Sequence, residues 1–133
     1  MLKTVPISGL AMALGLAAWL LPMKQATAQS APLHILVVEY DIVPGEVDKY
    51  VTAFKELGTA TVKEAGFRQV YITVSKDDPN HVLLFEAWDN AAAHAAHVKT
   101  DPFKKYQAAT GDMIAKRNVR IFSSVGMVSA ARQ

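Results

Sequence analysis

The sequence predicts an α+β fold of the ferredoxin-like kind, a split β-α-β-β-α-β sandwich. Four stretches have the short apolar runs and β-branched content of strands, at 33–43, 67–76, 81–88 and 118–125. Apolar residues recur at helical spacing between the first two strands. An alanine-rich segment and a second segment that begins with proline lie between the last two. These three observations together give the predicted order of elements.

The first strand and the first helix are bounded by residues that favour turns. Pro44-Gly45 breaks the strand, and Gly66 stops the helix predicted over 46–64. The helix has one apolar stripe, which consists of Val47, Tyr50, Val51, Phe54, Leu57, Thr61 and Val62.

The later elements have their own start and stop signals. The polar turn at 77–80 joins the second and third strands into a hairpin. Either Asp89 or Asn90 can cap the alanine-rich helix. Asp101 can cap the next helix, with Pro102 at its first position, and Gly111 ends or kinks it. The second helix of the fold is therefore predicted to be broken in two.

The predicted sheet has one covered face and one open face. Right-handed crossovers place both helical layers on the same side. With the strand order 4-1-3-2, the first and third strands are the central ones. Period-two counting assigns to the open face Ile35, Val37, Glu39, Tyr71, Thr73, Val82, Leu84, Glu86 and Trp88. Because so apolar a face is costly to leave in water, we expect a homodimer with a barrel-like core, a dimeric α/β barrel, formed through the face that bears Tyr71, Leu84 and Glu86.

The first 28 residues are predicted to be a signal peptide. The run from Ile7 to Met23 is apolar, and Ala26-Thr27-Ala28 has the small residues of a cleavage site. We therefore expect a mature domain at 29–133, periplasmic or secreted and not bound to a membrane after cleavage. An uncleaved anchor is the alternative.

The composition of the mature chain excludes one class of partner. Without Lys3 and Lys24, the 14 basic residues fall to 12, equal to the 12 acidic ones. No basic stripe is present, so nucleic acid is not an expected partner. The chain has no cysteine, so its stability depends on a single modest core and on assembly.

The stretch from Glu86 to Tyr106 concentrates proton-carrying groups and aromatic rings. His94 and His97 lie one turn apart on the alanine-rich helix, and Phe103 and Tyr106 lie one turn apart on the next. Packed against the end of the third strand, these groups would surround one small volume. The alanines at 91–93, 95 and 96 leave free volume beneath the helix, which favours a cavity.

Several motifs together resemble a known family. They are Glu39 before Gly45, Glu64-Ala65-Gly66-Phe67, Phe85-Glu86-Ala87-Trp88, Ala93-His94-Ala95-Ala96-His97, Thr100-x-Pro102-Phe103-Lys104-x-Tyr106 and Asn118-Val119-Arg120-Ile121. The chain resembles the antibiotic biosynthesis monooxygenases, and within them the small cofactor-independent quinol monooxygenases. The resemblance covers nearly the whole mature chain. It is specific for the fold and less so for the chemistry, because the family carries several activities on one scaffold.

The resemblance implies a homodimer that uses no metal, flavin or haem and oxidises a small quinol or phenolic compound with O₂. His97 would take the phenolic proton, and Tyr106 or Trp88 would donate to a substrate oxygen. The implied catalytic residues are His97, Tyr106 and Trp88. The implied substrate contacts are His94, Phe103, Tyr40 and Glu86, with His94 nearer the solvent edge. The haem-degrading members differ from this chain at the positions of Val38, His97 and Gln107, so haem degradation is not expected.

Other interpretations of these residues stay open. His97 can be a hydrogen-bonded core histidine, and Glu39 and Glu86 can pair with Arg120 at the dimer interface. The His94-x-x-His97 pair lacks a clear third ligand, so no metal site is predicted. The alternative functions are a non-catalytic aromatic-ligand binder, a stress-associated dimer without a ligand, and an isomerase of a small carbonyl metabolite. A phosphorylated substrate of the last would need converging basic groups, for which the nearby candidates are Lys99, Lys104 and Lys105.

Overall fold

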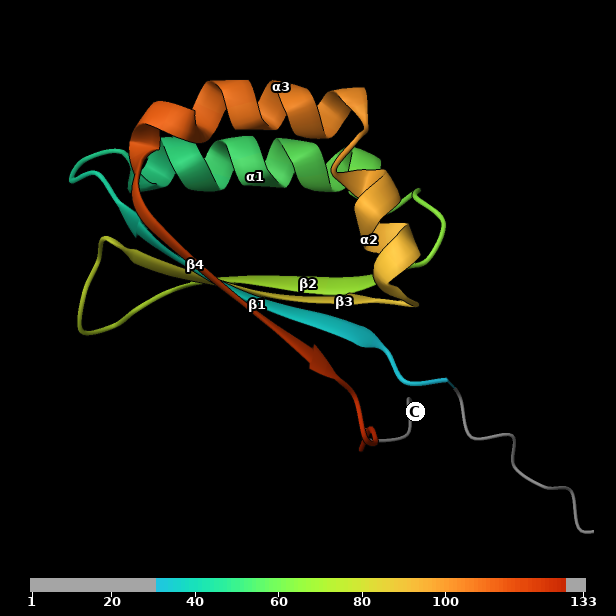
Figure 1. Cartoon of the computed structure of the whole chain (residues 1–133). Helices are drawn as coiled ribbons and strands as arrows, with labels where there is room; N and C mark the ends of the chain where they lie inside the picture. Colours follow the sequence, from blue (N-terminus) through green and yellow to red (C-terminus); the bar gives the residue numbers. More distant parts are fainter. Residues whose placement is uncertain (1–30, 129–133) are drawn as a thin grey trace, which may run out of the picture.

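The computed structural model describes residues 31–128. The predicted signal peptide at 1–28 therefore lies outside the described residues. The elements follow the predicted order, with the second helix broken in two (Figure 1). They are β1 (His34–Ile42), α1 (Val47–Thr61), β2 (Phe67–Val74), β3 (His81–Trp88), α2 (Ala91–His97), α3 (Asp101–Thr110), the 3₁₀ turn η1 (Gly111–Met113) and β4 (Ile114–Ser123). Over the described residues, no helix is both long enough and apolar enough to cross a membrane.

The four strands form one open antiparallel sheet with the order β2-β3-β1-β4, which confirms the predicted order. Helices α1 and α3 lie side by side over one face, and α2 lies across the end of that face near the start of β2 (Figure 1). Among residues 31–128, no helix covers the opposite face. The ferredoxin-like α+β fold is thus confirmed as two layers.

The core fills the space between the sheet and the helices. Alternate residues of β1 and β3 point toward the helices, where they meet the apolar stripe of α1. The largest buried members of this core are Trp88, Tyr50, Ile42 and Val82, each 2% exposed or less.

The face assigned to β3 was wrong. Val82, Leu84 and Trp88 belong to the core beneath the helices, and Glu86 lies on the same side. The open face of β3 instead carries Leu83 and Phe85, which the register places opposite Glu39, Val37, Thr73 and Tyr71. The assignments for Ile35, Val37, Glu39, Tyr71 and Thr73 agree with this register.

The helix caps and the last strand also differ in detail from the predictions. Asn90 caps α2, since its side chain accepts from the amide of Ala93 at 2.9 Å. Thr100, and not Asp101, caps α3 through the amide of Phe103 at 3.3 Å. Strand β4 begins at Ile114, four residues before the predicted start. Gly111 does follow the last residue of α3, as predicted.

The two glycines with positive φ have different surroundings. Gly45 has a φ of 86°, and a Cβ placed there would meet nothing within 4 Å. Gly66 has a φ of 81°, and its Cβ would lie 2.6 Å from the Cβ of Ala93. Gly66 therefore allows the turn between α1 and β2 to contact the first turn of α2 directly.

Replacing Gly66 with alanine should destabilise the protein more than the same change at Gly45. Gly45→Ala adds only the left-handed backbone strain, roughly 1–2 kcal/mol. Gly66→Ala adds an overlap with a rigid neighbour, for about 1–3 kcal/mol more. Urea unfolding of the two variants and the wild type measures the difference. Equal losses at the two positions would show that the contact with Ala93 is not tight.

Candidate functional site

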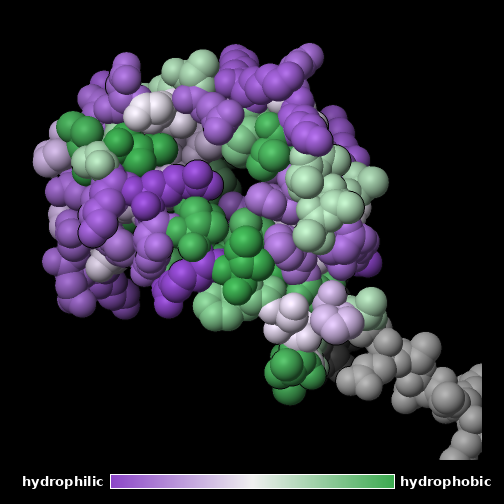
Figure 2. Space-filling model, in the orientation of Figure 1, coloured by the Kyte–Doolittle hydropathy of each residue, from purple (hydrophilic) through white to green (hydrophobic). Residues whose placement is uncertain are grey.

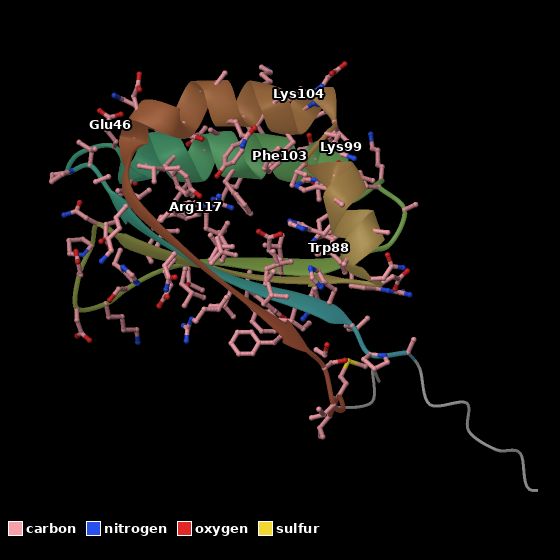
Figure 3. All side chains as sticks on the ribbon, in the orientation of Figure 1. Glu46, Trp88, Lys99, Phe103, Lys104 and Arg117 are labelled. Atoms are coloured by element: carbon pink, nitrogen blue, oxygen red, sulfur yellow. The ribbon has the colours of Figure 1, made fainter. Side chains whose placement is uncertain are left out.

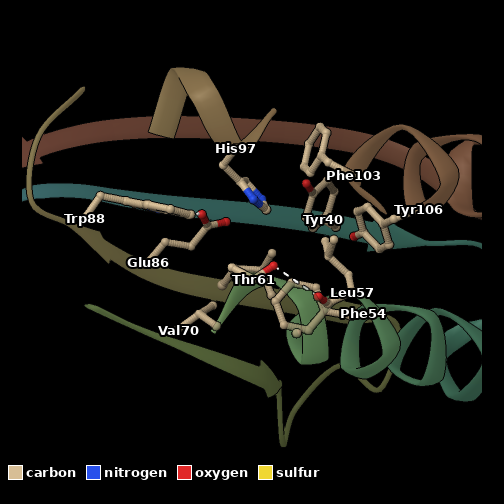
Figure 4. A pocket seen from close by; sticks show the side chains of 12 residues that line it. Tyr40, Phe54, Leu57, Thr61, Val70, Glu86, Trp88, His97, Phe103 and Tyr106 are labelled. Carbon is tan, nitrogen blue, oxygen red and sulfur yellow. Dashed lines mark hydrogen bonds between the residues drawn. The ribbon is translucent and has the colours of Figure 1, made fainter. Parts of the chain in front are cut away.

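A small pocket lies between the sheet and the helices, with a volume of about 40 Å³ (Figure 4). Strands β1, β2 and β3 form its floor, α1 and α3 form its walls, and the end of α2 closes it. It is lined by Tyr40, Phe54, Leu57, Gly58, Thr61, Val70, Leu84, Glu86, Trp88, His97, Phe103 and Tyr106. Six of the seven predicted site residues are in this lining.

His97 is the buried imidazole of the pocket. It is 5% exposed, and its ring points into the pocket from the last position of α2 (Figure 4). Its Nδ1 lies 2.8 Å from Oε2 of Glu64. The ring packs between Trp88 and Phe103, with both centroid distances 4.8 Å. Packing on two sides and the contact at Nδ1 fix the orientation of the ring.

Glu86 places a carboxyl group in the same pocket. Its Oε2 accepts a hydrogen bond from Nε1 of Trp88 at 3.3 Å, and the group lies between Trp88 and His97 (Figure 4). Burial raises the pKa of the Glu86 carboxyl, and the Trp88 hydrogen bond and the charges of His97 and Arg117 oppose this only in part. A raised pKa favours the protonated form, which can donate a hydrogen bond to a bound oxygen.

Three tyrosines from three elements meet at the other end of the pocket. The Tyr106 hydroxyl donates to the Tyr50 hydroxyl at 2.7 Å, and the Tyr40 ring lies 5.5 Å from that of Tyr50. Burial is the main cause that raises the pKa of all three phenols, so they remain neutral donors and acceptors. Since Tyr106 already donates to Tyr50, it can donate to a substrate only after giving up that bond.

Arg117 brings a cation to this group from the edge strand β4. The register pairs it with Tyr40, and its side chain lies between the sheet and the helices (Figure 3). Hydrogen bonding and charge from Arg117 lower the pKa of Tyr40 against the larger effect of burial. Arg117 is exposed, so it stands where the pocket region meets solvent.

His94, one of the predicted substrate contacts, lies outside the pocket lining. It is half-buried, and its ring centroid lies 5.7 Å from that of Trp88, edge to face, and 5.8 Å from that of His34. Burial, followed by the charges of His97, His34 and Arg117, lowers the pKa of His94 to about 4. His94 is therefore neutral near pH 7, and its ring lies near those of two pocket residues, Trp88 and His97.

The nearby lysines do not converge on the pocket. Lys99 and Lys104 lie on the outer side of the helices (Figure 3), and Lys105 pairs with Glu56 at 2.7 Å. Within residues 31–128, no three metal-ligating side chains are close enough together to hold an ion. The pairing predicted for Arg120 holds for Glu39 at 3.3 Å, but not for Glu86, which lies on the other face.

The alanines of α2 do not create the pocket. Ala91, Ala92, Ala95 and Ala96 are exposed, and Ala93 packs toward Gly66. The expectation that free volume beneath this helix makes the cavity was therefore wrong. The pocket instead lies beside the end of α2, where His97 and Phe103 meet the sheet.

Sequence reasoning missed three residues that shape the site. In the sequence, Glu64 belongs only to a motif, Tyr50 only to a helix stripe, and Arg117 precedes the predicted last strand. Each acts through a partner distant in the chain, as Glu64 does across 33 residues to His97. The one local signal was the Glu64-Ala65-Gly66 turn.

Residues 33–109 match the antibiotic biosynthesis monooxygenase family. A candidate enzyme of this name from Nitrosomonas europaea has a similar structure, with a TM-score of 0.69 and 21% identity over 71% of this chain and 92% of its own. One from Caulobacter crescentus has a TM-score of 0.68 and 21% identity, covering 73% of this chain and 93% of its own. These two likenesses show the shared fold. Because the family match spans more than half of the chain, the protein belongs to the antibiotic biosynthesis monooxygenase family.

Proposed function

We propose that this protein is a cofactor-independent monooxygenase that oxidises a small quinol or phenolic compound with O₂. Family membership supports a monooxygenase-type activity in general. The observation that carries the finer proposal is the buried His97 imidazole, which shares one aromatic pocket with the carboxyl group of Glu86.

The proposed reaction begins with a proton transfer. A phenolic O–H bond breaks, and Nε2 of His97 takes the proton. The resulting oxyanion is electron-rich and can pass an electron to O₂. For a hydroquinone, insertion of one oxygen atom into the ring gives a hydroxyquinone, and the second oxygen atom leaves as water. The substrate supplies all four electrons, so no cofactor is needed.

Other pocket groups would hold the substrate while it reacts. When protonated, Glu86 would donate to a substrate oxygen, and such a donor stabilises charge that develops in a dry site. Trp88 and Phe103 would pack against the substrate ring. Tyr40 and Tyr106 would complete the pocket wall, and His94 would support Trp88 from outside.

The pocket must widen before it admits a ring. Its volume of about 40 Å³ is well below the ~150 Å³ of a protein cavity known to bind benzene. The structure is therefore a closed state. The route of opening that we propose is an outward shift of Phe103, because this ring is only partly buried, whereas Glu64 and Gly66 hold α2 against the turn after α1.

The presence of His97 and Glu86 in one pocket also suits a second function, isomerisation of a small carbonyl compound. A base and a protonated carboxyl on one pocket can move a proton from carbon while polarising a carbonyl oxygen. A phosphorylated substrate is disfavoured because Lys99 and Lys104 point outward. Binding of a quinol without O₂ uptake would instead identify a non-catalytic binder.

We also propose that the protein is exported after cleavage of residues 1–28. We further propose that it forms a homodimer through the open face of the sheet. Apolar side chains of all four strands share this face, including Val37, Phe85, Tyr71 and Phe122. Tyr71 is 60% exposed and Phe122 47% exposed in the single chain. Hydrophobic residues gather over β1 and β4 in Figure 2, with hydrophilic residues around them. A second copy would remove this surface from water.

The dimer proposal is tested by a charge at Phe85. Phe85→Glu should dissociate the dimer, because it buries a carboxylate without a partner in the interface. Val62→Glu is the matched control, since Val62 is 64% exposed at the end of α1, away from the sheet. Sedimentation velocity should give a dimer for the wild type and the control. A folded wild-type monomer would contradict the proposal.

The catalytic proposal is tested by replacing the two histidines in turn. His97→Gln should lower kcat/KM for a quinol by ~10²–10⁴, the usual loss on removing a general base. His94→Gln should have much less effect, because His94 does not line the pocket. Oxygen uptake by metal-free protein with a panel of hydroquinones measures this, with thermal unfolding as the check on folding. Wild-type kcat/KM in His97→Gln would overturn the base assignment.

A further inference from the structure

The hydrogen bond between Glu64 and His97 connects two elements that are distant in the chain. Glu64 follows α1, His97 ends α2, and their side chains meet at 2.8 Å between Oε2 and Nδ1. Both side chains are largely out of solvent, 18% and 5% exposed. The second histidine–carboxylate pair, His81 with Asp41, is more exposed and lies away from the pocket.

The turn that carries Glu64 is held rigidly against α2. The amide of Glu64 donates to the carbonyl of Thr61 at 3.0 Å, and its own carbonyl accepts from Phe67 at 3.3 Å. Two residues on, the Gly66 carbonyl accepts from Asp89 at 2.7 Å, and Gly66 contacts Ala93 with no room for a side chain. The Glu64 carboxylate is thus placed by backbone contacts.

The His97 side of the pair is equally fixed. The carbonyl of His97 accepts from the amide of Thr100 at 3.0 Å and from its hydroxyl at 2.8 Å. Trp88 and Phe103 hold the two sides of the ring. With Nδ1 committed to Glu64, Nε2 is the nitrogen left for the pocket.

We propose that Glu64 is a positioning residue, which holds His97 in the tautomer that carries its proton on Nδ1. An ionised carboxylate can only accept hydrogen bonds, so Nδ1 must donate. Nε2 then keeps its lone pair and can take a proton from the substrate. This inference rests on the proposed function of His97 as the base. After transfer, the new Nε2–H bond leaves an imidazolium, which the adjacent Glu64 carboxylate stabilises.

If the contact between Glu64 and His97 were only structural, it would join the turn after α1 to α2 without selecting a tautomer of His97. Nitrogen-15 NMR of the histidine rings in the whole wild-type protein separates the two cases and needs no substrate. At about pH 8, where an ordinary imidazole is neutral, we expect His97 to show a protonated Nδ1 and an unprotonated Nε2. The nitrogen-15 signals that are present in the wild type and absent in the His97→Gln variant are assigned to the ring of His97. A wild-type His97 protonated on Nε2 would overturn the proposal.

Glu64→Gln tests whether the carboxylate causes this state. The amide can donate as well as accept, so the Nε2-protonated tautomer should appear. With a hydroquinone that the wild type oxidises, kcat should fall at least tenfold while KM changes little. Glu56→Gln is the matched control, because Glu56 is exposed and pairs only with Lys105 among the described residues. It should leave both the tautomer and kcat unchanged.

Two outcomes in Glu64→Gln would overturn the proposal, namely an unchanged tautomer or an unchanged kcat. The absence of any turnover in the wild type would count against the proposed oxygenase function instead. The tautomer measurement would still decide whether Glu64 positions His97.

Discussion

The structure depends on pairing every polar group that it buries between the sheet and the helices. Within residues 31–128, no buried side-chain nitrogen or oxygen lacks a hydrogen-bond partner. The imidazole of His97 has Glu64, the indole of Trp88 has Glu86, and the hydroxyl of Tyr106 has Tyr50. An unpaired group here would cost roughly 1–3 kcal/mol. The same pairs that make burial possible also fix the orientation of the groups around the pocket.

Much of the fold could be predicted because its signals are local. Strand and helix periods, Pro44-Gly45 and Gly66 gave the elements and their order. The face of β3 could not be read in this way, because HVLLFEAW is apolar on both faces and counting by two gives no preference. The start of β4 was missed because an edge strand can carry polar residues such as Lys116 and Arg117. Thr100 and Asp101 are both good caps, and only the backbone geometry selects Thr100.

The residues of the site also fall into two groups, those whose meeting could be predicted from the sequence and those whose meeting could not. Residues from Glu86 to Tyr106 lie close in sequence, so their meeting could be expected from two adjoining helices and a strand end. The contact of Glu64 with His97 could not be expected from the sequence, because it depends on the turn after α1 reaching the first turn of α2. The two faces of the sheet then separate the proposed roles. The helix side holds the chemistry of His97 and Glu86, and the open side holds the surface for a second copy.

In the proposed function, the pocket around His97 receives the aromatic substrate. A crystal structure of the protein grown without oxygen, with a bound hydroquinone, tests it most directly. We predict that the ligand ring lies beside His97, with Phe103 shifted outward and one ligand oxygen within hydrogen-bond distance of Nε2 of His97. A ligand bound elsewhere, with the pocket still closed, would contradict it.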